Sequence, residues 1–115
     1  MNKNHFGKFY NNEDVYLFSL KNDNGIEVKI TNYGGIITSI ITPDKNGNFS
    51  DIVLGFETLD EYLAGHPYFG VIIGRYCNRI KNGTFILNGI QYNLAKNDGD
   101  NHLHGGLKGF DKVLW

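Results

Sequence analysis

The amino-acid sequence predicts an all-β protein, specifically an antiparallel β-sandwich. Several short segments alternate apolar and polar residues with the two-residue period of a half-buried strand. Turns rich in glycine, asparagine and aspartate separate these segments, and a short helix is expected among them. Because frequent strands joined by Gly-rich turns are typical of β-sandwiches, this fold class is the expected one.

The first predicted element is a hairpin over residues 15–32. Apolar residues occupy alternate positions of residues 15–20 and do so again over residues 26–30. Asp23-Asn24-Gly25 supplies the turn between these two strands. We therefore expect the apolar face of the hairpin to pack inward.

Two further extended segments follow the hairpin. Residues 36–42 contain the pairs Ile36-Ile37 and Ile40-Ile41, which leave little polar surface on either face and indicate a strand covered on both sides. Residues 43–47 are dense in turn-forming residues and end this strand. Extended structure is expected to resume over residues 51–56.

A short helix is predicted after Thr58. Thr58 and Glu61 fit a capping box, in which the hydroxyl and the carboxylate each bind a backbone amide at the start of the helix. Gly65 and Pro67 follow closely, so the helix is expected to last only a turn or two.

The clearest hairpin signal is Asn88-Gly89, a pair that tolerates the positive backbone angles of a tight type I′ turn. It joins predicted strands at residues 84–87 and 90–94. The chain then ends in the apolar, strand-like residues 113–115, with no turn or polar tail after them. Truncation of a longer domain is the simplest interpretation of that ending.

Composition limits the chain to one soluble domain at most. Its 115 residues are 41% hydrophobic and 14% aromatic, and the formal net charge is -1. This balance argues against a nucleic-acid partner, and no apolar run is long enough for a signal peptide or a membrane span. Cys77 is the single cysteine, which excludes an intrachain disulfide and fits a reducing compartment. We expect a cytoplasmic protein with no membrane partner.

A polar segment near the end of the chain carries the first candidate binding chemistry. Residues 101–106 place two imidazole side chains, His102 and His104, one residue apart in a Gly-flanked stretch. This stretch has little apolar mass and is not expected to belong to the core. The alternative interpretation is a solvated loop whose histidines have no function.

The second segment with candidate binding chemistry is residues 70–80. It begins as an apolar run and then carries the polar residues Arg75, Asn78 and Arg79. Its glycines lack P-loop spacing, so a nucleotide site is not expected. Asn78 and Arg79 could present an amide and a rigid guanidinium fork to a neutral, hydroxyl-rich ligand such as a sugar. The alternative is that these arginines lie along the surface or form ion pairs, as most arginines do.

Together these segments resemble the galactose mutarotase, or aldose 1-epimerase, family. The resemblance is carried by residues 74–80, 101–106 and 109–115, and also by residues 32–35 and 51–55. The order and spacing agree with the family, with Arg79 and His104 lying 25 positions apart. Cys77 departs from the small residue, such as Ala, that family members commonly carry, and this changes no expected function.

The resemblance implies an enzyme that interconverts the α and β anomers of aldohexoses such as galactose and glucose, without cofactor or metal, on a galactose mutarotase-like sandwich. Residues 1–115 are then expected to form the amino-terminal part of a single aldose 1-epimerase domain. By matching motif positions, Asn78 and Arg79 are expected to bind sugar hydroxyls. His104 is expected to bind substrate near the ring oxygen as a catalytic residue. His102 has no matching role and is interpreted as a loop residue.

Anomer exchange is acid–base chemistry. The resemblance places the family's general acid, a second histidine, and its general base, a late glutamate, beyond Trp115. Asp100 and Glu61 are available carboxylates, but their spacing to His104 does not indicate that either one replaces the base. We therefore expect the chain to bind sugar weakly and to turn it over poorly. A partial sandwich is also expected to leave strand edges unpaired, which favours aggregation.

Two other functions fit parts of the sequence. His102 and His104 offer two ligands for a cupin-like metal site. No Glu or later His follows them, so such a site would need His5 or His66 from far upstream. A non-catalytic carbohydrate-binding module could use the same sugar-contacting residues together with Tyr76.

Overall fold

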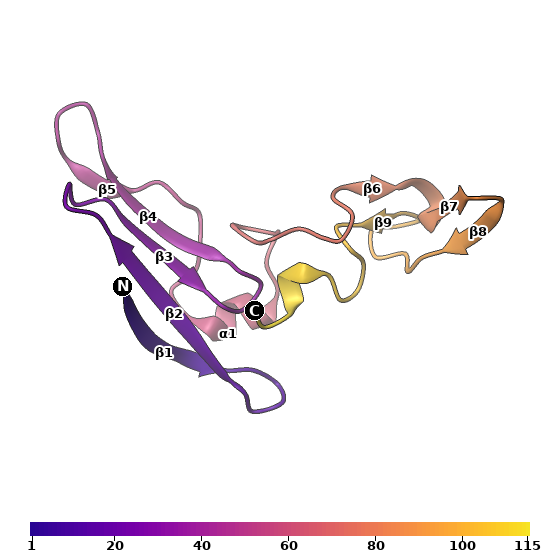
Figure 1. Cartoon of the computed structure of the whole chain (residues 1–115), viewed down its shortest axis with the longest axis horizontal. Coiled ribbons are helices and arrows are strands. Elements are labelled where there is room, and N and C mark those ends of the chain that lie inside the picture. The colour runs from indigo at the N-terminus through magenta and orange to yellow at the C-terminus, as the bar shows by residue number, and fades with distance from the viewer. The chain divides into compact units, whose positions relative to one another are not determined.

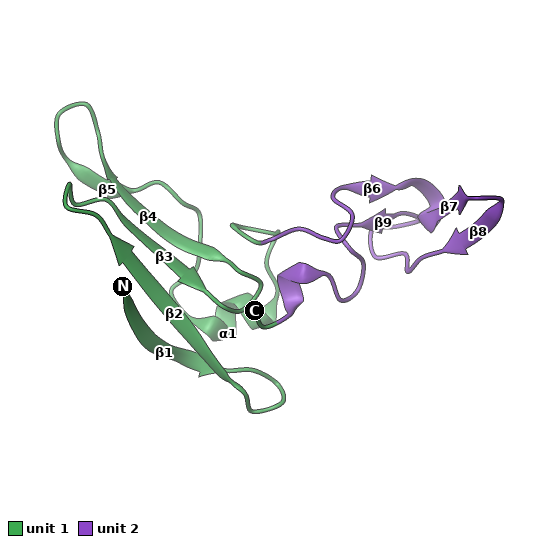
Figure 2. Cartoon of the chain, viewed as in Figure 1, with its two compact units in different colours: residues 1–71, 114–115 green, residues 72–113 purple.

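A computed structural model describes all residues, 1–115, and its elements are mainly short antiparallel strands (Figure 1). The backbone divides into two compact units, one of residues 1–71 with 114–115 and one of residues 72–113 (Figure 2). Helix is confined to α1 (Leu59–Ala64) and to 3-10 turns at Lys81–Gly83 and Phe110–Lys112. None of these helices has the length and apolar character needed to cross a membrane. The all-β, antiparallel prediction is confirmed.

The first unit is built on a five-stranded antiparallel sheet in which the strands follow chain order. Its strands are β1 (Asn2–Lys8), β2 (Asp14–Lys21), β3 (Glu27–Thr31), β4 (Ile37–Pro43) and β5 (Phe49–Asp51). The predicted hairpin over residues 15–32 is confirmed as β2 and β3, with Leu20 opposite Val28. In its turn, Asn22 Oδ1 accepts hydrogen bonds from the backbone N–H groups of residues 24 and 26 at 3.1 and 2.9 Å.

Strand β1 was not predicted, because its residues are mostly polar and exposed. It pairs along β2 as an edge strand, where polar and lysine residues are common because they discourage further pairing. Lys3 places its ammonium group 3.6 Å from the centroid of the Tyr16 ring on β2. Such a strand owes its place to pairing with a neighbour, which no local sequence pattern reports.

The extended segment expected over residues 51–56 is wrong in position, because β5 already ends at Asp51. The Asp51 carboxylate explains this, since Oδ1 accepts from the backbone N–H of Ile40 at 3.0 Å and from that of Val53 at 2.9 Å. A continuing β5 would need the Ile40 amide for its own ladder. The Ser39 side chain, together with backbone amides, also lowers the pKa of Asp51.

The predicted helix α1 is confirmed together with its capping box. The backbone N–H of Thr58 donates to Glu61 Oε2 at 3.0 Å, and the backbone N–H of Glu61 donates to Thr58 Oγ1 at 3.4 Å. The Thr58 hydroxyl donates to the same carboxylate and lowers the pKa of Glu61. The helix ends before Gly65, as expected.

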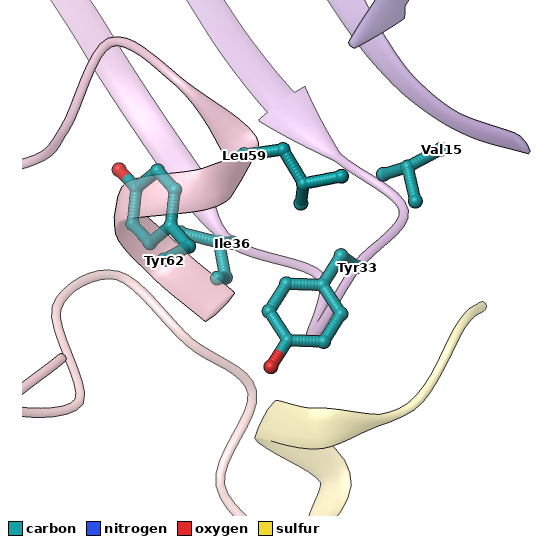
Figure 3. Close-up of a cluster of buried hydrophobic side chains, with 5 residues drawn as sticks. All are labelled: Val15, Tyr33, Ile36, Leu59 and Tyr62. Carbon is teal, nitrogen blue, oxygen red and sulfur yellow. The ribbon is translucent and has the colours of Figure 1, made fainter. Parts of the chain in front are cut away.

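The core of the first unit is the cluster Val15, Tyr33, Ile36, Leu59 and Tyr62. Figure 3 shows Leu59 and Tyr62 on the helix, with the other three side chains gathered beside them. The Tyr62 hydroxyl accepts a hydrogen bond from the backbone N–H of residue 56 at 2.9 Å, and burial raises the pKa of Tyr62. The helix therefore supplies two of these five side chains, whereas β2 supplies Val15 and the turn between β3 and β4 supplies Tyr33 and Ile36.

Strand β4 is less covered than its sequence predicts. Ile36, just before the strand, is fully buried, whereas Ile37, Ile40 and Ile41 are only half-buried. The expectation that both faces of residues 36–42 are covered is therefore wrong for this chain. Adjacent pairs of apolar residues indicate that both faces of a strand are hydrophobic. They do not indicate that a second layer of the same chain covers it.

We expect Tyr62→Phe to lower the free energy of unfolding by about 1–2 kcal/mol, because the backbone N–H of Phe56 would lose its acceptor in a partly buried position. Urea denaturation followed by fluorescence measures the change. Tyr10→Phe is the matched control, since the Tyr10 hydroxyl donates to the carbonyl of Leu63 but the residue is 76% exposed. Its expected effect is below about 0.5 kcal/mol, and equal losses in the two variants would contradict the prediction.

The second unit contains two small antiparallel pairs. Strand β6 (Arg79–Ile80) pairs with β9 (His102–Leu103), and β7 (Thr84–Leu87) pairs with β8 (Ile90–Asn93). The predicted hairpin at Asn88-Gly89 is confirmed, with φ of 50° and 78° at the two turn residues, as a type I′ turn requires. The β6–β9 pair had no counterpart in the prediction.

The apolar run at residues 113–115 forms no named strand. Leu114 makes an isolated antiparallel bridge to Tyr33, and the backbone N–H of Trp115 donates to the carbonyl of Asn32 at 2.9 Å. These residues therefore extend the first unit, although they follow the second along the chain.

Candidate functional site

The three residues predicted to bind sugar all lie in the second unit, at the β6–β9 pair. Arg79 is opposite Leu103 in the register, so Asn78 and His104 are the next residues along. The backbone N–H of His104 donates to the carbonyl of Asn78 at 3.2 Å. In return, the backbone N–H of Asn78 donates to Nδ1 of the His104 ring at 3.0 Å. Asn78 and His104 are therefore in direct contact.

This contact determines which nitrogen of His104 carries the proton. An amide N–H can only donate, so Nδ1 must be the acceptor, and the neutral ring carries its hydrogen on Nε2. An Nε2–H group is a donor suited to an oxygen with lone pairs, such as a pyranose ring oxygen or a hydroxyl. The backbone of His104 adopts a φ of 55°, which allows its side chain to reach back to the amide of Asn78.

Asn78 is itself held in an uncommon conformation. Its φ is 68°, and its side-chain Oδ1 accepts from the backbone N–H of Arg79 at 2.9 Å. Asparagine tolerates this left-handed region better than most residues because its short polar side chain can bond locally. The amide nitrogen of Asn78 carries the two donors that a sugar hydroxyl could use.

Arg79 makes an ion pair, which the sequence left as an alternative to ligand binding. Its Nε donates to Oδ2 of Asp98 at 2.6 Å, while the Arg79 side chain is 55% exposed. It also lines an open cavity of about 440 Å³, together with Tyr76, Ile80, Lys81 and Phe85. His104 is not among these lining residues, so simultaneous contact of Arg79 and His104 with one sugar stays a prediction.

Asn97 is a residue that sequence reasoning missed. In an antiparallel pair every second residue points its N–H and carbonyl away from the partner strand. Leu103 is in that position, and Asn97 satisfies both groups: its Oδ1 accepts from the Leu103 N–H at 2.8 Å, and its Nδ2 donates to the Leu103 carbonyl at 2.9 Å. The Asn97 amide thus takes the place of a third strand beside β9. We call this pair of hydrogen bonds between Asn97 and Leu103 the Asn97 bracket. No periodicity in the sequence predicts it.

The interpretation of His102 as a loop residue is wrong. His102 belongs to β9, is 7% exposed, and makes a 2.9 Å hydrogen bond from Nδ1 to the carbonyl of Ala95. A carbonyl only accepts, so here Nδ1 carries the hydrogen, the opposite tautomer to that of His104. Leu103 and Gly106 are buried as well, so residues 101–106 are not the exposed stretch that their composition suggested.

Ligands for a metal are not gathered anywhere in the structure. No three His, Cys, Asp or Glu side chains lie close enough together to hold an ion. In particular, His102 and His104 have no third ligand beside them, as a cupin-like site would require.

Comparison with known proteins then identifies the family. The model of the aldose 1-epimerase family matches residues 16–115. The chain belongs to the aldose 1-epimerase family. The resemblance carried by its three motifs is thereby confirmed.

Named relatives are similar over most of the chain. Galactose mutarotase from Sus scrofa is 53% identical over 101 residues, and that from Homo sapiens is 50% identical over the same length. Each alignment covers 88% of this chain and 29% of the relative. The chain therefore spans about 29% of the length of the curated relatives that it matches.

Solved structures agree with the fold class. A galactose 1-epimerase from Lactobacillus acidophilus matches with a TM-score of 0.82 at 29% identity, covering 99% of this chain and 32% of the other. An aldose epimerase homologue from C. elegans matches with a TM-score of 0.81 at 36% identity, covering 86% of this chain and 30% of the other. The predicted galactose mutarotase-like, antiparallel fold is confirmed.

Proposed function

We propose that this chain supplies the amino-terminal, sugar-contacting part of an aldose 1-epimerase that interconverts the α and β anomers of aldohexoses such as galactose and glucose. Residues 1–115 then belong to a single epimerase domain. Membership of the family and 53% identity to a galactose mutarotase support the reaction and the substrate class. Cys77 is a free thiol, which supports a reducing compartment such as the cytoplasm.

The reaction needs a base at the anomeric hydroxyl and an acid at the ring oxygen. Proton transfer opens the ring to an aldehyde, the C1–C2 bond rotates, and closure on the other face gives the second anomer. In this proposal the Nε2–H of His104 donates to the substrate near its ring oxygen and polarises it. Asn78 and Arg79 hold sugar hydroxyls, because an amide and a guanidinium offer several fixed donors.

The observation that carries this proposal is the hydrogen bond from the Asn78 backbone N–H to His104 Nδ1. It joins residues 26 positions apart and, because Nδ1 accepts, the neutral imidazole carries its hydrogen on Nε2. It brings together two of the three proposed sugar-contacting residues, each of which has a side-chain group that can donate. Donors are what a neutral ligand rich in oxygen lone pairs requires.

No carboxylate of the chain is proposed as the general base. Asp98 lies beside Arg79, but its carboxylate already accepts the Arg79 Nε–H at 2.6 Å. The Asp98 oxygen that faces Arg79 is therefore occupied by the guanidinium. Binding without efficient turnover is therefore expected of the 115-residue chain.

Saturation-transfer NMR with galactose and glucose, together with polarimetry of freshly dissolved α-D-galactose, tests the proposal on the 115-residue chain. We expect weak binding of both sugars and mutarotation close to the rate in buffer. Arabinitol, an acyclic polyol that has no ring oxygen, is the control ligand and should give a smaller signal. Absence of any galactose or glucose signal would contradict the sugar site. Acceleration comparable to that of a complete mutarotase would show that a base is present within these residues.

A further inference from the structure

Beside the proposed sugar-contacting residues lies an ion pair that the family resemblance did not indicate. Arg79 donates through Nε to Oδ2 of Asp98 at 2.6 Å, a short charge-assisted hydrogen bond. The side chain of Asp98 is 33% exposed, less than that of its arginine partner at 55%. The bond uses Nε, the nitrogen within the side chain, so the donors of the two terminal NH₂ groups take no part in this contact.

The backbone holds Asp98 in place independently of Arg79. Asp98 and Asn101 form an antiparallel bridge across a tight turn, with hydrogen bonds of 3.1 and 2.9 Å between their backbones. Asn97, the preceding residue, brackets Leu103, and Leu103 in turn faces Arg79 in the β6–β9 register. Both members of the ion pair are therefore tied to β9, one through the strand pairing and the other through the Asn97 bracket.

We propose that Asp98 is a positioning residue that orients the Arg79 guanidinium and makes the site selective for neutral aldoses over anionic sugars. This inference rests on the proposed function, since it concerns the same sugar-binding residues. Orientation follows from the hydrogen bond at Nε, which restrains the position of the guanidinium. Selectivity follows because the Asp98 carboxylate offsets the charge of Arg79, so that Arg79 offers hydrogen-bond donors with little net attraction for an anion.

The two effects of Asp98 can be separated by substitution. Asp98→Asn removes the charge but keeps a side-chain oxygen that can accept from Arg79 Nε, whereas Asp98→Ala removes both. Asp100→Ala is the matched control, because Asp100 lies in the same turn, is 89% exposed and pairs with Lys96 at 3.8 Å. The control removes one negative charge from the turn and leaves the Arg79 contact intact.

The experiment measures NMR-detected dissociation constants for galactose and for galacturonate in the 115-residue chain, together with hydrogen exchange at Arg79 Nε. Loss of a partly exposed ion pair corresponds to a change of up to about fivefold in an equilibrium constant. We expect Asp98→Ala to weaken galactose binding about threefold to fivefold. Asp98→Asn should stay within about twofold of wild type for galactose.

In both Asp98 variants the affinity for galacturonate relative to galactose should rise about threefold to fivefold, and in Asp100→Ala it should stay unchanged. Arg79 Nε–H should be protected from exchange in wild type and in Asp98→Asn, and lose that protection in Asp98→Ala. An unchanged sugar preference in both Asp98 variants, or an Arg79 Nε–H that exchanges freely in wild type, overturns the inference. If wild type binds neither sugar while Arg79 Nε–H is protected, the proposed function fails, and the selectivity assigned to Asp98 fails with it.

Discussion

Gly105→Ala is expected to unfold the loop that carries His104 and to lower its local stability by about 3 kcal/mol or more. Gly105 has a φ of 95°, and a Cβ at this position would overlap the carbonyl oxygen of Gly74. The Cβ position is fixed by the backbone and the Gly74 oxygen is itself a backbone atom, so no side-chain rotation can relieve the overlap. The Asn78–His104 contact is expected to be lost together with the loop. Native-state hydrogen exchange of the amides of residues 101–106 measures the effect.

Gly89→Ala is the control for that substitution. Gly89 also has a positive φ, 78°, but an added Cβ would meet no atom within 4 Å. It should therefore cost only the conformational strain, about 1–2 kcal/mol, and leave the His104 loop protected. Similar exchange in the two variants would mean that the Gly74 contact does not constrain the loop.

Arg79→Ala is expected to reduce turnover by one to a few orders of magnitude in a chimera that contains a general base. The chimera joins this chain to the remainder of Sus scrofa galactose mutarotase, to which it is 53% identical over 101 residues. Hydrogen bonds to charged groups contribute roughly 1.5–3 kcal/mol each, and the loss of one or more from the sugar accounts for the expected decrease. Polarimetry with α-D-galactose gives kcat/KM.

Arg75→Ala serves as the matched arginine control, since Arg75 lies 5.3 Å from the centroid of the Phe110 ring and is assigned no sugar contact. Activity of the Arg79 variant within twofold of the parent chimera would remove Arg79 from the site. An unmodified chimera that binds galactose without turning it over would favour the alternative of a carbohydrate-binding module.

The sequence predicted best the elements whose signals are local. The capping box of α1 and the Asn88-Gly89 turn each depend on residues within a few positions of one another, and both were predicted within a residue or two. Strand β1 failed because polar edge residues carry no pattern of their own. Strand β5 was misplaced because a single carboxylate, Asp51, takes the amide that would have continued the ladder.

In the candidate site, too, some features were predicted from the sequence and others were not. Asn78, Arg79 and His104 were predicted from the family resemblance, and the contact between Asn78 and His104 follows from the register of β6 with β9. An ion pair of Arg79 was left open as an alternative, but its partner Asp98 and the bracket made by Asn97 were not predictable, because they depend on how a turn folds back on a distant strand. The burial of His102 was missed for the same reason, since its partner is a backbone carbonyl seven positions earlier.

The Asn97 bracket has a consequence for how this chain associates with other molecules. Templated growth of a fibril requires a row of backbone amides and carbonyls that a second polypeptide can join. At Leu103 those groups are already occupied by the Asn97 side chain, whereas β1 and β5 are the outermost strands of their sheet. Intermolecular strand addition should therefore start at an edge that no side chain occupies, such as β5, and leave the segment next to His104 in its native pairing.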